Sequence, residues 1–347
     1  MSLLTSLISH QIWLQRTASG EVKDLAPFIQ EMRDEIKRQV LLFGDDGRST
    51  ARLNKLLRDL EEALTGLTGD WQTKLTEDLK ELAAYEAEWN VKTLTANVNA
   101  EFVTPTAEQV WAAAEFQPLS LSDKPVDFTK LMSGWGETEV ARLVTGVKMG
   151  FVQGQTTRQI VKSVVGAGGL ADISERNAAT VIRTALSHVS NEARNETYRQ
   201  NDDIIEKYEI VATLDSRTST ICRSLDRQEY EISKGPRPPF HPNCRTTTAP
   251  VISSEFDFLD KGAKRAAKGA NGGTQVSADT TYYEFLKQQP AWFQDQALGP
   301  VRGKIFRNSG ISPEEFRVIS VDGFGNPLTL KQMAELDKRV ADYLKGE

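Results

Sequence analysis

Apolar residues recur at intervals of three and four along most of the first hundred positions, which is the spacing of amphipathic helices. The start of the chain, residues 1–16, fits one such helix, and a second begins at Pro27, a residue suited to a first helical turn. A third stripe steps by four and three through five leucines: Leu53, Leu57, Leu60, Leu64 and Leu67. Because Gly66 and Gly69 weaken a helix, we expect this one to end near them.

The helical region 1–101 has two interpretations. Its stripes can pack on one another as a helical hairpin or bundle. Alternatively, the region is an elongated arm whose leucine stripe docks on a partner protein or on sister copies, because a narrow apolar seam is typical of associating helices. A Pro-containing linker, residues 102–136, follows, with one short helix expected at residues 108–115.

The pattern changes after a long helix expected at residues 174–200. Residues 207–215 alternate apolar and polar positions, which indicates a strand, and further short strands are expected downstream. Helices return in a C-terminal extension, residues 253–347, which also holds a basic, low-complexity segment expected to be a mobile loop. The sequence therefore predicts a mostly helical α+β fold: an N-terminal helical arm or bundle, central helices followed by a small antiparallel β-module within residues 137–252, and C-terminal helices.

Composition limits the classes of protein that fit. A net charge of −6 argues against a protein that coats nucleic acid over its whole surface. No stretch approaches the ~18 apolar residues of a membrane span. The N-terminus lacks the basic region and cleavage site of a secretion signal. Two cysteines in 347 residues do not make a disulfide framework, so we expect synthesis in a reducing interior.

The candidate chemistry gathers around the stretch PPFHPNCR, residues 238–245. His241 and Cys244 have a spacing that lets both reach one metal ion, and Cys222 can add a third ligand. Ser219 is a poor zinc ligand, which leaves Asp215 as an outside candidate for the fourth position. The interpretations are a zinc knuckle with one zinc per chain, a metal-free module with buried thiols, and a disulfide between the two cysteines.

A polar cluster is expected beside this stretch. Asp215, Arg217 and Arg245 should form a buried or half-buried ionic group, because an arginine fork can satisfy a carboxylate and strand carbonyls together. Pro238 and Pro239 stiffen the turn and reduce the entropy lost when it is ordered. We expect this group to stabilise the fold without performing chemistry.

This set of motifs resembles the Mu F-like minor head proteins of tailed bacteriophages, which are also called head morphogenesis proteins. The resemblance covers residues 137–252 and rests on an Arg-Thr pair in a helix, an Asp-x-Arg-Thr element and a Pro-Pro-x-His-x-x-Cys-Arg element. The matching residues are Arg183, Thr184, Asp215, Arg217, Thr218, Cys222, Pro238, Pro239, His241, Cys244 and Arg245. Ser219 stands where the family usually has a first cysteine, and Thr246 stands where it has a last one.

The resemblance implies a minor capsid protein that is made in the host cytoplasm and becomes part of the virion. It implies association with the portal protein at one vertex of the head, with the major capsid or scaffolding protein and packaged DNA as further partners. It also implies a role in head morphogenesis and in DNA packaging or ejection, without catalytic activity.

Other function classes have weaker support. An ADP-ribosyltransferase-like effector would use the TST and EYE elements, residues 218–220 and 229–231, but these lie too close together to build its cleft. A zinc hydrolase would need a general base that no motif places. A DNA-binding structural protein of the head interior would use the basic run of Lys261, Lys264, Arg265 and Lys268, whose alternative is a solvated loop.

Overall fold

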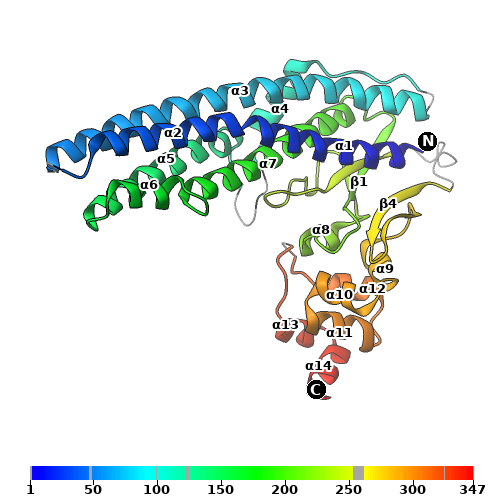
Figure 1. The fold of residues 1–347 in the computed structure, drawn as a ribbon. Helices are drawn as coiled ribbons and strands as arrows, with labels where there is room; N and C mark the ends of the chain where they lie inside the picture. The colour runs from blue at the N-terminus through cyan, green and yellow to red at the C-terminus, as the bar shows by residue number, and fades with distance from the viewer. Residues whose placement is uncertain are drawn as a thin grey trace.

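The computed structural model describes residues 2–46, 49–98, 100–119, 121, 125–252, 262–323 and 325–346. Long helices lie side by side and form an elongated bundle, and a smaller C-terminal lobe projects from one end of it (Figure 1). The mostly helical α+β fold predicted from the sequence is confirmed. The helices of the bundle are α1 (Leu3–Asp24), α2 (Ala26–Phe43), α3 (Thr50–Val98), α4 (Ala107–Phe116), α5 (Phe128–Val152), α6 (Thr157–Val165) and α7 (Leu170–Arg199).

Helix α3 corrects one expectation, because it continues through Gly66 and Gly69 for 49 residues. Each glycine costs a helix about 1 kcal/mol relative to alanine. Large apolar side chains on both flanks, such as Leu64 and Trp71, are buried against the other helices and offset this cost. Tertiary packing therefore overrides the local weakness.

The leucine stripe packs inside the chain. Leu60 and Leu64 are fully buried, and the other three leucines lie against the same core. In the structure the N-terminal helices therefore pack as part of the bundle. The docking surface predicted on Leu53, Leu57, Leu60, Leu64 and Leu67 is wrong, because these side chains already have partners within the chain.

The Pro-containing segment also packs on the bundle. Its short helix α4 is confirmed, with Thr106 and Gln109 forming a capping box. Val110 and Ala114 of α4 are buried in the same core as α3 and α7. Helix α5 begins at Phe128, inside the predicted linker, because Asp127 caps its first turn.

The β-module follows α7. Strand β1 (Ile205–Val211) lies between β2 (Glu229–Glu231) and β3 (Thr247–Ile252), and both pairings are antiparallel. The short helix α8 (Thr220–Leu225), which sequence reasoning missed, lies between β1 and β2 along the chain. Apolar side chains of α1 and of the end of α3 pack on this module, so it rests against the bundle.

The basic segment expected to be a mobile loop is instead a hairpin of β4 (Lys264–Gly269) and β5 (Gly272–Ser277). It is joined to the segment that follows β1, since Lys268 donates its backbone N–H to the carbonyl of Leu214. Lys261 lies outside the described residues. The hairpin forms despite its alanines and lysines, because the hydrogen bond between Lys268 and Leu214 ties β4 to the rest of the chain.

The C-terminal lobe consists of short helices around a separate core that includes Tyr282, Phe285 and Phe306. Pro290 separates the first two of these helices along the chain. The helices are α9 (Tyr282–Lys287), α10 (Ala291–Leu298), α11 (Pro300–Asn308), α12 (Pro313–Val318), α13 (Leu330–Leu336) and α14 (Lys338–Gly346).

A buried glutamate on α7 makes stability depend on pH. Burial raises the pKa of Glu192 from 4.5 to about 7, against the opposing charges of Arg237 and Arg199. The folded state therefore keeps this proton longer than the unfolded state, so stability falls as pH rises from about 4.5 to 7 and stays lower above that range. We expect Glu192→Gln to raise the free energy of unfolding by about 1–3 kcal/mol at pH 8, with a much smaller gain at pH 5.

Urea denaturation at both pH values measures this difference. The exposed Glu206→Gln is the matched control and should leave the pH dependence unchanged. Equal effects of Glu192→Gln at pH 5 and pH 8 would show that Glu192 does not carry the dependence.

Candidate metal centre

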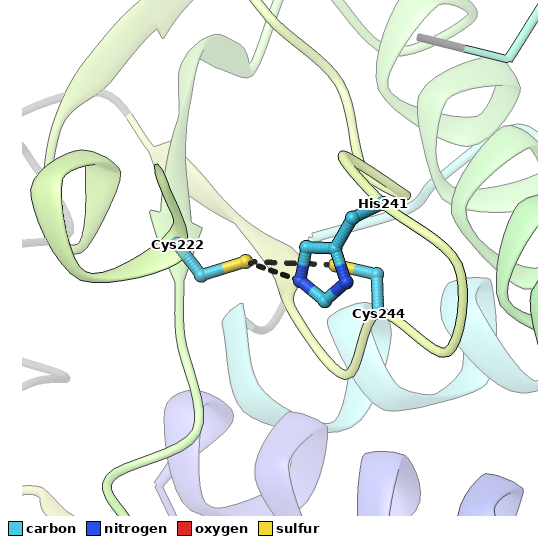
Figure 2. A group of neighbouring side chains, drawn as sticks. All are labelled: Cys222, His241 and Cys244. Atoms are coloured by element: carbon cyan, nitrogen blue, oxygen red, sulfur yellow. Dashed lines mark hydrogen bonds between the residues drawn. The ribbon is translucent and has the colours of Figure 1, made fainter. Parts of the chain in front are cut away.

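Three side chains from two separate segments converge beside the sheet. The ligand atoms of Cys222, His241 and Cys244 all lie within 4.8 Å of one another. The Cys222 sulfur is 3.3 Å from Nε2 of His241 and 3.6 Å from the Cys244 sulfur, and all three side chains point toward one another (Figure 2). Tetrahedral zinc places two sulfurs about 3.8 Å apart and a sulfur and a nitrogen about 3.6 Å apart. The cluster therefore has the spacing of a zinc site.

The thiols are both free, so the alternative of a disulfide between Cys222 and Cys244 is not what the structure contains. Both cysteines are buried. Cys222 comes from α8, whose first turn is capped by the Ser219 hydroxyl. His241 and Cys244 come from one turn, in which Cys244 donates its N–H to the His241 carbonyl.

Helix α7 holds this turn in place. The Thr184 hydroxyl accepts a hydrogen bond from the backbone N–H of Asn243, and the Asn243 amide reaches the Thr180 hydroxyl. Asn243 has φ 58, a left-handed conformation that asparagine tolerates. Of the Arg183–Thr184 pair in this helix, Thr184 is therefore the residue that contacts the site. Arg183 is partly exposed, and its side chain makes no hydrogen bond or ion pair with the described residues.

The orientation of the imidazole also suits metal binding. Nδ1 of His241 lies 2.9 Å from the Pro242 carbonyl, an acceptor, so Nδ1 carries the proton. Nε2 then faces the two sulfurs as the free ligand atom. A backbone partner on the second ring nitrogen is the usual way in which proteins orient a metal-binding histidine.

The electrostatics favour one thiolate in the cluster. Burial raises the pKa of the Cys222 thiol well above its usual value, and the hydrogen bond with Cys244 acts in the same direction. Burial would raise the pKa of Cys244 too, but hydrogen bonds with Cys222 and His241 hold it well below its usual value. The hydrogen bond with Cys244 is the main cause that raises the pKa of His241. Cys244 is therefore the readiest thiolate, the form that binds metal.

The side chains that could add a fourth ligand do not join the cluster. The Ser219 hydroxyl accepts the backbone N–H of Cys222 at 3.4 Å, and the hydroxyls of Ser219 and Thr246 lower the pKa of Cys222 in opposition to its burial. Asp215, the outside candidate for the fourth ligand, is not in the cluster, because both of its carboxylate oxygens accept from Arg245, at 2.6 and 2.9 Å. The described residues thus offer three ligands, with hydroxyls beside them.

The predicted ionic cluster forms in part. Burial would raise the pKa of Asp215, but the hydrogen bonds and charge of Arg245 hold it below its usual value. The Thr218 hydroxyl and the Arg217 backbone N–H also donate to Asp215. The Arg217 side chain, however, is 77% exposed, with its Nε 3.9 Å from the carboxylate. Arg217 is therefore peripheral to a pair formed by Asp215 and Arg245.

A second ion pair was missed by sequence reasoning. Arg265 of β4 is fully buried and binds both carboxylate oxygens of Asp226, at 3.0 and 2.9 Å. Asp226 also accepts backbone N–H groups from Ala212 and Tyr282. The prediction of Arg265 as a DNA contact is wrong, because this side chain joins three segments inside the protein. Lys264 and Lys268 are exposed on the hairpin.

The fold and this site define a class of protein. It has a long helical bundle, a small antiparallel sheet that follows the last bundle helix, and a Cys–Cys–His cluster beside the sheet. Residues 141–249 match the family described as phage Mu protein F like protein. This match confirms the resemblance to the Mu F-like family over a minority of the chain, including all three cluster residues. Comparisons with curated proteins and with solved structures gave no match.

Among the described residues, no helix combines the length and the apolarity that a bilayer crossing requires.

Proposed function

We propose that the protein is a minor head protein of a tailed bacteriophage that acts in head morphogenesis at the portal vertex. The observation that carries the proposal is the family match over the segment that holds the cluster. The portal protein is the expected partner, with the major capsid or scaffolding protein and packaged DNA as further partners. The docking surface lies outside the leucine stripe, whose side chains are used within the bundle.

In this protein the Cys222–His241–Cys244 cluster would bind one zinc ion per chain and so stabilise the folded β-module. Two buried thiols and an imidazole of fixed tautomer match the donor set and spacing of zinc. A metal here would tie α8 to the turn held by α7, which suits a module with a small sheet. Zinc bound to the unfolded chain would lack these preformed contacts, so binding would stabilise the fold.

A hydrolytic role for such a zinc ion has less support. Catalysis would require a general base near the metal. The nearest motif glutamates lie on β2, where Glu229 pairs with Lys207 and Glu231 pairs with Lys234. Both are exposed, and neither belongs to the metal-binding group. We therefore assign a structural role.

The position of the protein in the head tests the proposed function. Gold-labelled antibody against an epitope tag on the full-length chain should mark one vertex of opened phage heads, and the tagged chain should co-purify with the portal protein. Heads assembled without this chain are the negative control. The proposal would be contradicted if the gold label were spread evenly over the shell. It would also be contradicted if heads that assemble normally carried no label.

A further inference from the structure

A groove lies between residues 8–15 of helix α1 and the β4–β5 hairpin, beyond the point where the Thr5 hydroxyl donates to the Lys264 carbonyl. Its volume is about 590 Å³, and it extends along the end of β1. Ile8 and Ile12 of α1 and Leu214 give it apolar walls, and Ile12 remains 45% exposed. A preformed apolar groove with a few polar groups is the usual form of a binding site.

One polar group in this groove has no partner. Gln11 of α1 is 6% exposed, and its side-chain oxygen Oε1 accepts no hydrogen bond from the described residues. Its amide nitrogen reaches the Arg245 carbonyl at 3.4 Å. A buried acceptor without a donor costs free energy, so the groove favours a ligand that supplies an N–H group.

The hairpin presents an open strand edge at the same place. In the antiparallel pair, Lys268 lies opposite Gly273, and the Lys268 N–H points away from β5 to Leu214. By the alternation of the ladder, the N–H and C=O groups of Gly273 and Gln275 point away from β4. In the described part of the chain, β4 is the sole strand paired with β5. Gly273 and Gln275 also line the groove.

This edge lacks the usual protection against strand addition. Natural edge strands carry charged residues, prolines or bulges that block pairing. Strand β5 reads GGTQVS and has none of these. Its register with β4 is continuous from Lys264 to Gly269. The edge is therefore competent to accept another strand.

The charge around the groove indicates the sign of its ligand. Arg245 lines the groove and is neutralised by Asp215. Lys268 also lines it, is exposed, and forms no ion pair with the described residues. An acidic residue on the ligand would complement this lysine.

We propose that the groove binds an extended peptide segment of a partner protein, which adds as a strand to β5, places apolar side chains between α1 and the hairpin, and sets an acidic residue near Lys268. Backbone hydrogen bonds supply affinity in this mode, and alternate side chains supply specificity. The proposal concerns binding alone and does not depend on the role of the protein in a phage head.

Two substitutions at one position test strand addition. Gln275→Pro removes the outward N–H without removing a β4–β5 hydrogen bond, whereas Gln275→Ala keeps that N–H. The probe is a fluorescein-labelled synthetic peptide with apolar residues at three alternate positions and aspartate at both ends, titrated into the full-length chain by anisotropy. We expect Gln275→Pro to weaken binding at least about tenfold and Gln275→Ala to change it less than about twofold.

Modified probes keep the test valid if Gln275→Pro disturbs the hairpin. A peptide with N-methyl groups on alternate backbone nitrogens should bind the unaltered chain at least about tenfold more weakly, since it cannot complete the ladder. A peptide with lysine at both ends should also bind more weakly, and Lys268→Glu should reverse that preference. Equal binding of the methylated and unmethylated peptides, or no saturable binding below about 1 mM, would overturn the proposal.

Discussion

Asp226→Ala should lower the free energy of unfolding by about 3–5 kcal/mol, because it leaves the buried Arg265 guanidinium without its counter-charge. The same change removes the acceptor for the backbone N–H groups of Ala212 and Tyr282. These donors lie at the end of β1 and at the start of α9, so the loss should loosen the joint between the β-module and the C-terminal lobe. A loss of stability of this size approaches the whole free energy of unfolding of many domains.

Chemical denaturation followed by circular dichroism measures this effect. Asp279→Ala is the matched control, since it removes the same carboxylate from the same module at a side chain that is 92% exposed. We expect the control to change stability by less than about 0.5 kcal/mol. If both variants unfold at the same denaturant concentration as the unaltered chain, the Arg265–Asp226 pair does not support the fold.

Ser219→Cys should tighten zinc binding by about 100-fold, because it supplies a thiolate to a centre that has three ligands. The Ser219 hydroxyl caps the first turn of α8 and accepts the backbone N–H of Cys222 at 3.4 Å, so a thiol at this position would lie beside the cluster. Four protein ligands are the rule in structural zinc sites. The same substitution would restore the cysteine that the Mu F-like pattern has at this place.

Competition with a chromophoric chelator gives the zinc affinity of each variant. Ser219→Ala is the matched control, because it removes the same hydroxyl without adding a ligand, and it should bind zinc no more tightly than the unaltered chain. Equal affinities of Ser219→Cys and Ser219→Ala would mean that position 219 does not face the metal.

The cluster was predictable because its signal is local. The His-x-x-Cys spacing places His241 and Cys244 on one turn, and the structure brings Cys222 to them from α8. Helical periodicity likewise predicted α2, which has Pro27 in its first turn. These features depend on residues that are close in sequence.

The errors arose where distant partners decide the structure. Nothing near Arg265 shows that Asp226, 39 positions away, will accept its guanidinium, so a basic run looked like a solvated loop. Strand β4 has little β-branched character, and its edge is satisfied by Leu214. The leucine stripe showed that a helix face is apolar, but whether it meets another segment or another protein is a tertiary property.

The metal content of the purified full-length chain tests the three-ligand centre most directly. Protein prepared without chelators should contain about one zinc ion per chain by elemental analysis and by native mass spectrometry. Cys244→Ser, which removes the readiest thiolate, should contain none and should melt at a lower temperature. Unaltered protein that contains no zinc, takes up none when zinc is added, and melts at the same temperature with and without it would contradict the metal centre.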